Sequence, residues 1–124
     1  MAVVAVIDDN RDELQQALLS LKSTGQFEVV YGFTCPDEAC CFIKERRVDV
    51  LFMEIEMKGL NCFVLIDKLR KTGLDILYVI MTSNEGYACE AFQKGIVDYV
   101  LKPLSPGGVA LTLEKIRKYH KREK

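Results

Sequence analysis

Charged residues at the ends of three apolar runs could carry chemistry in this 124-residue chain. Asp8 and Asp9 end the first run, Glu54 ends a second, and Lys102 follows a third. If the runs are neighbouring parallel strands, these groups converge at the carboxyl end of the sheet, where open α/β sheets bind ligands. Carboxylates crowded there raise one another's pKa, and Mg²⁺ resolves the repulsion because it commonly bridges carboxylates to phosphate. The spacing therefore indicates a site for Mg²⁺ and a phosphoryl group.

Hydroxyl groups and a proline belong to the same predicted site. Thr82 and Ser83 follow a fourth apolar run, so their hydroxyls are expected in the same cleft, where hydroxyl and ammonium groups suit phosphoryl oxygens. Pro103 biases Lys102 away from helical geometry and keeps its side chain extended over the strand ends. Tyr99 could move between a buried and an exposed position. The plainer alternatives are an ordinary strand aromatic and, for the acidic pair, a simple helix start with favourable dipole charges.

The elements that must position these groups alternate in type along the chain. Four continuous apolar runs are typical of strands buried on both faces: Ala2–Ile7, Val48–Met53, Ile76–Met81 and Ile96–Leu101. A shorter run with one polar position, Phe27–Tyr31, is a candidate for an edge strand. Between the strands lie five stretches with the periodicity of helices. The first starts near Asp12, the second has Pro36 in its first turn, and the third has Asn61 as its N-cap; the fourth covers Glu85–Lys94 and the fifth Val109–Tyr119. Such alternation predicts one α/β domain, a doubly wound five-stranded parallel sheet with five helices.

Composition limits the class of protein. The hydrophobic fraction of 49% is ordinary for a folded globular domain. No apolar run approaches the roughly 20 residues of a membrane span, and no signal peptide precedes the first strand, so a cytoplasmic protein is expected. Residues 114–124 hold six Lys or Arg against two Glu, which leaves the rest of the chain acidic. We interpret this basic ending as the solvated end of a last helix, because an acidic body lacks the footprint of a DNA-binding domain.

The cysteines do not form a recognisable metal site. Their number is five, no CxxC occurs, and the only histidine, His120, lies in the polar tail. Zinc-site spacing is therefore absent, and the cysteines are interpreted as reduced thiols that act as small hydrophobes. A redox switch that uses Cys40 and Cys41 beside Cys35 remains the alternative.

Four motifs together resemble the response-regulator receiver domain, the phosphoacceptor module of two-component signalling, over essentially the whole chain. They are Asp8–Asp9, Glu54–Asn61, Thr82–Ser83 and Asp98–Leu104. The Tyr87–Phe92 helix and the strand at Asp98 and Tyr99 look most like receivers that precede LytTR-type DNA-binding domains. The resemblance implies a flavodoxin-like receiver topology.

The resemblance also implies roles for individual residues. The metal ligands would be Asp8, Asp9, the residue at position 54 and the backbone carbonyl of Glu56. Thr82 would bond a phosphoryl oxygen, Lys102 would pair with the phosphoryl group, and Tyr99 would be the switch aromatic, together with Thr82. The face made by the fourth helix, fifth strand and fifth helix would mediate pairing of two copies. A sensor histidine kinase would be the partner if phosphorylation survives.

Three positions depart from the family pattern. Glu54 stands where the family has the acceptor aspartate, Lys58 where it usually has proline, and Cys62 where it usually has glycine. Phosphotransfer needs accurate placement, since about 1 Å of misplacement can cost about a hundredfold in rate. Glu54 carries its carboxylate farther by roughly one C–C bond, within reach of Lys102. The hypothesis is that Glu54 accepts phosphate poorly and partly imitates the phosphorylated state.

The sequence thus predicts a receiver domain over residues 1–119, with 120–124 as a basic tail or the start of a linker, and a pseudo-receiver rather than an enzyme. The alternative is a conventional Mg²⁺-dependent phosphorylatable receiver that controls transcription through an attached DNA-binding domain. Nucleic acid would then be contacted only outside this chain, and no membrane is involved.

Two other functions are alternatives, one that uses the same α/β architecture and one that uses the same metal ion. A flavodoxin-like cofactor binder needs a phosphate-cradling loop, but the loop Asp8–Asp12 repels phosphate without metal. A Mg²⁺ phosphohydrolase lacks a good nucleophile or general base in the cleft.

Overall fold

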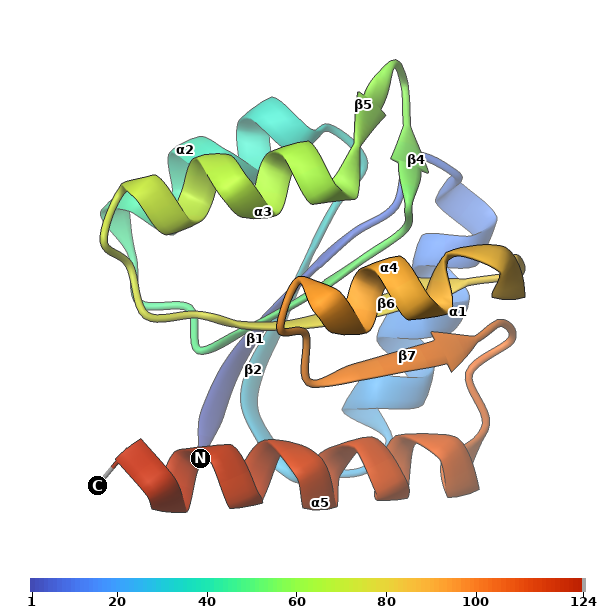
Figure 1. Cartoon of the computed structure of the whole chain (residues 1–124). Coiled ribbons are helices and arrows are strands. Elements are labelled where there is room, and N and C mark those ends of the chain that lie inside the picture. The colour runs from blue at the N-terminus through green and yellow to red at the C-terminus, as the bar shows by residue number, and fades with distance from the viewer. Residues whose placement is uncertain (124) are drawn as a thin grey trace.

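The computed structural model describes residues 1–123, with side chains through Tyr119, as a parallel sheet between two layers of helices (Figure 1). The strand order is β2-β1-β3-β6-β7. The bounds are Phe27–Phe33 for β2, Ala2–Ile7 for β1, Val50–Met53 for β3, Leu77–Thr82 for β6 and Asp98–Leu101 for β7. All neighbouring pairs run parallel. The predicted five-stranded doubly wound sheet is confirmed, with the second strand at an edge as expected.

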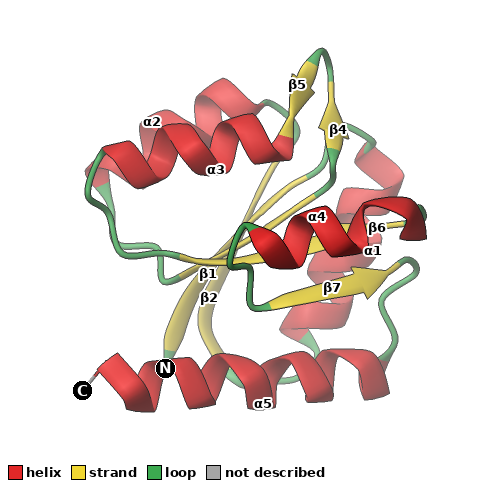
Figure 2. Cartoon of the chain, in the orientation of Figure 1, coloured by secondary structure: helices red, strands yellow, loops and turns green. Residues whose placement is uncertain are grey.

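Helices cover both faces of the sheet (Figure 2). One face packs against α1 (Arg11–Lys22) and α5 (Pro106–Glu123), and the other against α2 (Pro36–Glu45), α3 (Cys62–Lys71) and α4 (Ala88–Gln93). Alternate residues of each central strand enter the two cores: Val4 and Val6 of β1 face one, and Ala5 and Ile7 the other. Because both faces are covered, these strands read as continuous apolar runs. Within the described residues, no helix has the length and apolar character needed to cross a membrane.

Element boundaries differ from the sequence prediction where polar caps act. The predicted helix from Glu85 to Lys94 is a 3₁₀ turn, η1 (Glu85–Tyr87), followed by the six-residue α4. The Asn84 side chain accepts a hydrogen bond from the Gly86 amide at 2.8 Å, and this local turn competes with a regular helical start. The last helix begins at Pro106, since proline suits a first turn, and continues to Glu123. Lys124 lies outside the described residues.

A small hairpin follows β3 that the sequence pattern did not predict. Its strands are β4 (Glu56–Met57) and β5 (Leu60–Asn61), paired antiparallel. The two turn residues between them, Lys58 and Gly59, have φ values of 40° and 78°. A two-residue type I′ hairpin turn requires positive φ at both central residues, and its twist matches that of the flanking strands. Proline could not adopt this conformation, so Lys58 in the usual proline position allows a differently shaped loop beside the site.

Candidate functional site

The predicted groups meet at the carboxyl end of the sheet. Asp8 follows β1, Glu54 follows β3, Thr82 ends β6 and Lys102 follows β7. A cleft of about 340 Å³ opens there; it is lined by Asp8, Asp9, Asn10, Glu13, Glu54, Ile55, Glu56, Thr82, Asn84 and Tyr87. The central positions of β1 and β3 in the sheet bring residues 46 positions apart in sequence to one edge. Topology therefore assembles the site, as parallel strand ends do in open α/β sheets.

The Lys102 ammonium is the centre of the site. Its Nζ donates to Asp8 Oδ2 at 2.6 Å, to Glu13 Oε2 at 2.7 Å and to Glu54 Oε1 at 2.7 Å. An ammonium has three donors, so every donor of Lys102 ends on a carboxylate. The lysine side chain is 8% exposed and that of Asp8 is 1% exposed. Charge-assisted bonds of this kind are about twice as strong as neutral ones, so the lysine ties three segments of the chain together.

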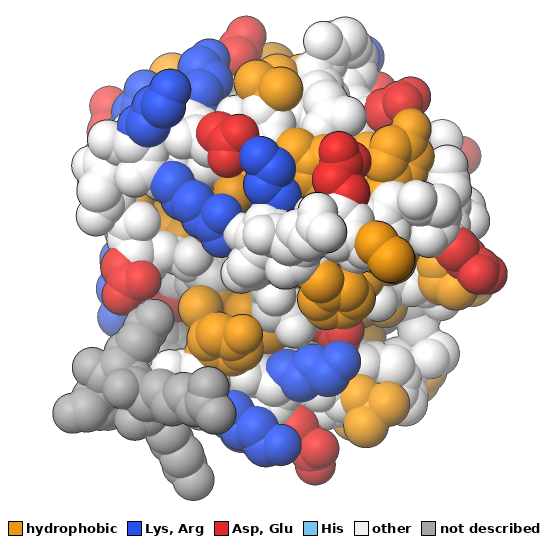
Figure 3. All heavy atoms as spheres, viewed as in Figure 1, with side chains coloured by type: hydrophobic (Ala, Val, Ile, Leu, Met, Phe, Trp, Pro, Cys, Tyr) orange, Lys and Arg blue, Asp and Glu red, His pale blue; other side chains and the backbone are white. Residues whose placement is uncertain are grey.

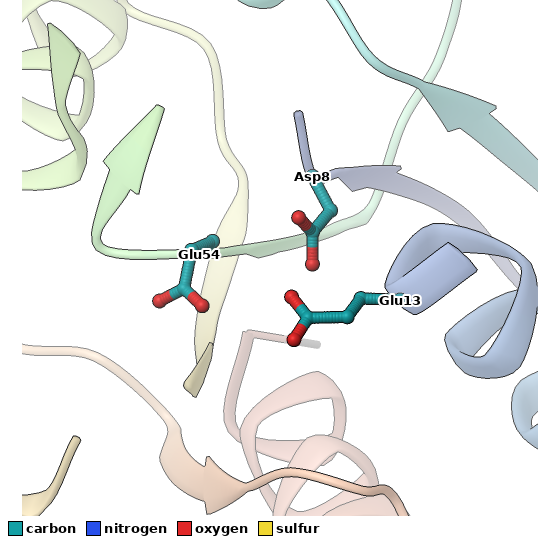
Figure 4. A group of neighbouring side chains, drawn as sticks. All are labelled: Asp8, Glu13 and Glu54. Atoms are coloured by element: carbon teal, nitrogen blue, oxygen red, sulfur yellow. The ribbon is translucent and has the colours of Figure 1, made fainter. Parts of the chain in front are cut away.

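The three carboxylates converge from separate elements (Figure 4). One oxygen from each of Asp8, Glu13 and Glu54 lies within 4.8 Å of the others. Clustered carboxylate oxygens are the donor set that Mg²⁺ prefers, so the residues fit the metal that the sequence predicted. The same three carboxylates bond Lys102 in this arrangement, so the ammonium supplies the positive charge at the cluster.

The surroundings shift the pKa of both partners. Burial raises the pKa of Asp8 above its ordinary value, although the hydrogen bonds from Lys102 and the Asn10 amide oppose the shift. Burial alone would lower the pKa of Lys102, but the hydrogen bonds to Asp8, Glu13 and Glu54 outweigh it, so that pKa lies above the ordinary lysine value. Lys102 therefore stays charged at neutral pH and remains the counter-charge of the cluster.

Both oxygens of Glu54 are engaged. Oε1 accepts from Lys102, and Oε2 accepts from the Ile55 amide at 2.7 Å. The side chain is 17% exposed and borders the cleft. The structure thus places the Glu54 carboxylate against Lys102, which the length of this side chain led us to expect.

The two carboxylates of the acidic pair have different partners. Asp8 is buried and bonds Lys102, while Asp9 lines the cleft and accepts from the Lys58 amide at 3.0 Å. Asp9 therefore holds the β4–β5 hairpin and is not one of the three converging carboxylates. Glu56 also lines the cleft. The ligand roles of Asp9 and of the Glu56 carbonyl stay predictions.

Thr82 and Tyr99 meet at one residue of the β6–η1 loop. Thr82 is 3% exposed, and its hydroxyl accepts from the Asn84 amide at 3.3 Å; the Tyr99 hydroxyl donates to the Asn84 carbonyl. The Tyr99 ring packs against the core shared by α2, α3 and α4. Ser83 differs from the prediction: it lines a neighbouring hollow with Lys102 and not the cleft, because successive residues of an extended segment point to opposite sides.

Sequence reasoning missed Glu13. Asn10 caps α1 by accepting from the Glu13 amide at 3.0 Å, so the spacing from Asn10 to Glu13 matches a capping pattern. In that pattern the glutamate side chain bonds the cap, whereas here it reaches Lys102. The only available signal was a carboxylate in the first helical turn after an acidic loop. Its partner lies 89 residues away, and only the tertiary structure identifies it.

Cys62 does not take part in the site chemistry. Its side chain is fully buried, and burial, followed by the nearby charge of Glu54, raises its pKa to about 12. A thiol that remains protonated is a poor nucleophile. The five cysteines are all free of disulfide bonds.

Two bacterial regulators illustrate the similarity in sequence. Sensory transduction protein LytT of Bacillus cereus is 31% identical over 121 residues, which cover 95% of this chain and 48% of that protein. Transcriptional regulatory protein NatR of Bacillus subtilis is 27% identical over 118 residues, with 95% and 51% covered. The chain therefore spans about half the length of the curated relatives it matches.

Solved structures share the fold. A response regulator receiver domain protein from Clostridium thermocellum superposes with a TM-score of 0.84 at 19% identity, and the match covers 100% of both chains. The family model described as the response regulator receiver domain matches residues 4–114. Receiver domains in general are signalling modules of two-component systems rather than enzymes. The chain belongs to the response regulator receiver domain family, and LytT-type regulators are among its relatives.

Proposed function

We propose that this chain is a pseudo-receiver, in which Glu54 takes the acceptor position without accepting a phosphoryl group efficiently. The observation that carries the proposal is the 2.7 Å contact between Glu54 Oε1 and Lys102 Nζ, together with the second oxygen bound to the Ile55 amide. Hydrogen bonds to both oxygens make the carboxylate a weaker nucleophile and hold it against Lys102 and the Ile55 amide. The longer side chain also displaces the oxygens from the position of an aspartate, and in-line transfer tolerates little displacement.

Partial imitation of the phosphorylated state is the expected output. Glu54 already pairs with the lysine that would bind a phosphoryl group, and the Tyr99 hydroxyl already bonds the Asn84 carbonyl at the Thr82 loop. The imitation is incomplete in charge, because one carboxylate replaces a group that carries about two negative charges. The chain would then hold one conformation constitutively instead of switching between two.

Mg²⁺ remains part of the proposal. Asp8, Asp9, Glu54 and the Glu56 carbonyl are the ligands that the resemblance implies, and Glu13 adds a further oxygen to this set. When bound, the ion supplies charge neutralisation for phosphoryl oxygens. This chain would contribute the oxygens that hold the ion, and the Lys102 ammonium bonds three of the same carboxylates.

Incubation with acetyl phosphate and Mg²⁺ tests the proposal. We expect the intact mass of the wild-type chain to stay unchanged, because the longer side chain, held by Lys102 and the Ile55 amide, displaces its oxygens from the position of an aspartate. Intact-protein mass spectrometry measures the outcome, and hydroxylamine treatment distinguishes an acyl phosphate from other adducts. A stoichiometric, hydroxylamine-sensitive phosphoryl adduct mapped to Glu54 contradicts the proposal.

A conventional receiver attached to an output domain is the second candidate. Its support is the length of the relatives, since the matched regulators are about twice as long as this chain. In that case a sensor histidine kinase would supply the phosphoryl group in the cytoplasm, and a DNA-binding domain outside this chain would regulate transcription. Phosphorylation of Glu54 in the experiment above favours this candidate.

We also propose that two copies pair through the face made by α4, β7 and α5. Figure 3 shows hydrophobic side chains among charged ones on this face. The large exposed ones are Phe92, Leu101 and Leu111, at 51%, 45% and 62% exposed. Asp98 links α5 to β7 within this face by accepting from the Thr112 hydroxyl at 2.6 Å and Lys115 at 2.9 Å.

Replacing Phe92 with Asp is expected to weaken pairing, because a charge inside an apolar contact is left unpaired. Sedimentation equilibrium measures the effect: we expect at least tenfold weaker self-association, or about 1.4 kcal/mol. Leu19→Asp is the matched control, since Leu19 is 69% exposed on α1, away from this face. Equal weakening by both substitutions, or a wild-type chain that stays monomeric, rejects pairing through this face.

A further inference from the structure

One polar stripe of α1 contacts the segment that carries Lys102. Glu13, Gln16 and Ser20 lie three and four residues apart, which places them on one face of the helix. Glu13 bonds Lys102 at 2.7 Å. Gln16 and Ser20 both donate to the Leu104 carbonyl, at 3.1 and 3.2 Å, and the Gln16 side chain accepts from the Leu104 amide at 3.4 Å. The stripe therefore holds the β7–α5 connection at both ends of the stretch from Lys102 to Leu104.

The opposite face of α1 fixes the helix to the sheet. Leu14, Ala17 and Leu21 are buried in the core that α1 shares with α5. The stripe is thus a rigid support, since its helix cannot shift without opening that core. Glu13 is the member that faces the cleft, and its side chain is 44% exposed.

We infer that Glu13 is a positioning residue, which holds the Lys102 ammonium against Asp8 and Glu54 from the α1 side. Two carboxylates on strand ends would leave one donor of the ammonium free to turn toward solvent. The third carboxylate removes that freedom, so Lys102 can donate to a further group in the cleft only by giving up one of its three carboxylate bonds. The inference concerns only where the Lys102 nitrogen is held, and this does not depend on the proposed function. Its consequence for signalling does rest on the proposed function.

The side-chain ammonium signal of Lys102 in a ¹H–¹⁵N NMR spectrum tests this role directly. An ammonium with all three protons in hydrogen bonds exchanges them slowly with water and gives a visible signal. We expect this signal in the wild-type chain and assign it by its disappearance in Lys102→Met. Lys94 and Lys115 also pair with carboxylates, but their side chains are 34% and 49% exposed, so their protons exchange faster.

Glu13→Ala is expected to abolish the Lys102 signal, because loss of one charge-assisted bond raises proton exchange by about tenfold or more. The substitution keeps the helix cap, which uses the Glu13 backbone amide and not its side chain. Asp12→Ala is the matched control: Asp12 is an exposed acid in the same first turn, and its removal should leave the signal in place. The backbone amide spectrum confirms that each variant is folded.

An unchanged Lys102 signal in folded Glu13→Ala overturns the inference, as does its loss in Asp12→Ala to the same extent. A wild-type chain without any Lys102 signal also overturns it. The readout uses no phosphoryl donor, so phosphorylation of Glu54 would reject the proposed function and leave this inference standing.

Discussion

Glu54→Asp is expected to take up one phosphoryl group from acetyl phosphate in the presence of Mg²⁺, at least about a hundredfold faster than the wild-type chain. The shorter side chain withdraws the carboxylate from Lys102 by roughly one C–C bond and returns it to the acceptor position of the family. A carboxylate oxygen then attacks phosphorus and acetate leaves. Asp8, Thr82 and Lys102 already surround this position, so one substitution should suffice. Intact mass and hydroxylamine sensitivity measure the product.

Two controls make the result specific. Glu54→Asn provides no acceptor and should remain unlabelled under the same conditions. Chelation of Mg²⁺ should abolish labelling of the aspartate variant, because the acidic cluster then lacks the charge that offsets phosphoryl oxygens. Equal labelling of wild type and Glu54→Asp would falsify the idea that side-chain length is the obstacle. A folded aspartate variant that stays unlabelled rejects it as well.

Lys102→Met is expected to lower the free energy of unfolding at pH 7 by about 3 kcal/mol or more. The substitution removes the counter-charge from Asp8, Glu13 and Glu54, and the carboxylate of Asp8 is 1% exposed. Removing one partner of a buried ion pair leaves an uncompensated charge, which costs more than the pair itself contributes. Urea unfolding followed by circular dichroism measures the loss. Lys94→Met is the control: its pair with Asp67 is exposed, so a change of about 1 kcal/mol or less is expected.

Between pH 7 and pH 5, the Lys102→Met chain should gain stability relative to the wild type as pH falls. In the wild type, the raised pKa of Lys102 contributes stability that is fully present below the ordinary lysine pKa and is lost as pH rises through the higher folded value. Without the lysine, the cluster carboxylates repel one another and their folded pKa values rise. The folded variant then binds protons more tightly than its unfolded chain, so it should regain stability as pH falls from 7 toward 5. A Lys102→Met chain whose loss relative to wild type is the same at both pH values contradicts this account of the site.

Secondary structure was predictable where burial alone decided it. The central strands are apolar at almost every position because helices cover both faces, and residue type alone indicates such runs. Boundaries depended on local polar contacts. The Asn84 turn breaks the expected fourth helix into η1 and α4, and Lys58 adopts positive φ, which is uncommon outside glycine, asparagine and aspartate. Residue preferences predict neither the Asn84 turn nor the positive φ of Lys58.

The sequence by itself determined which strand ends carry charge, because Asp8, Glu54 and Lys102 directly follow apolar runs and parallel strands end at the same edge. It also showed that position 54 holds a glutamate. Only the tertiary structure decided which oxygen meets which donor. Hydrogen bonds require partners within about 3 Å, and strand periodicity does not fix distances across 89 residues, so the contact from Glu13 to Lys102 emerged only when α1 packed beside β7 and its loop.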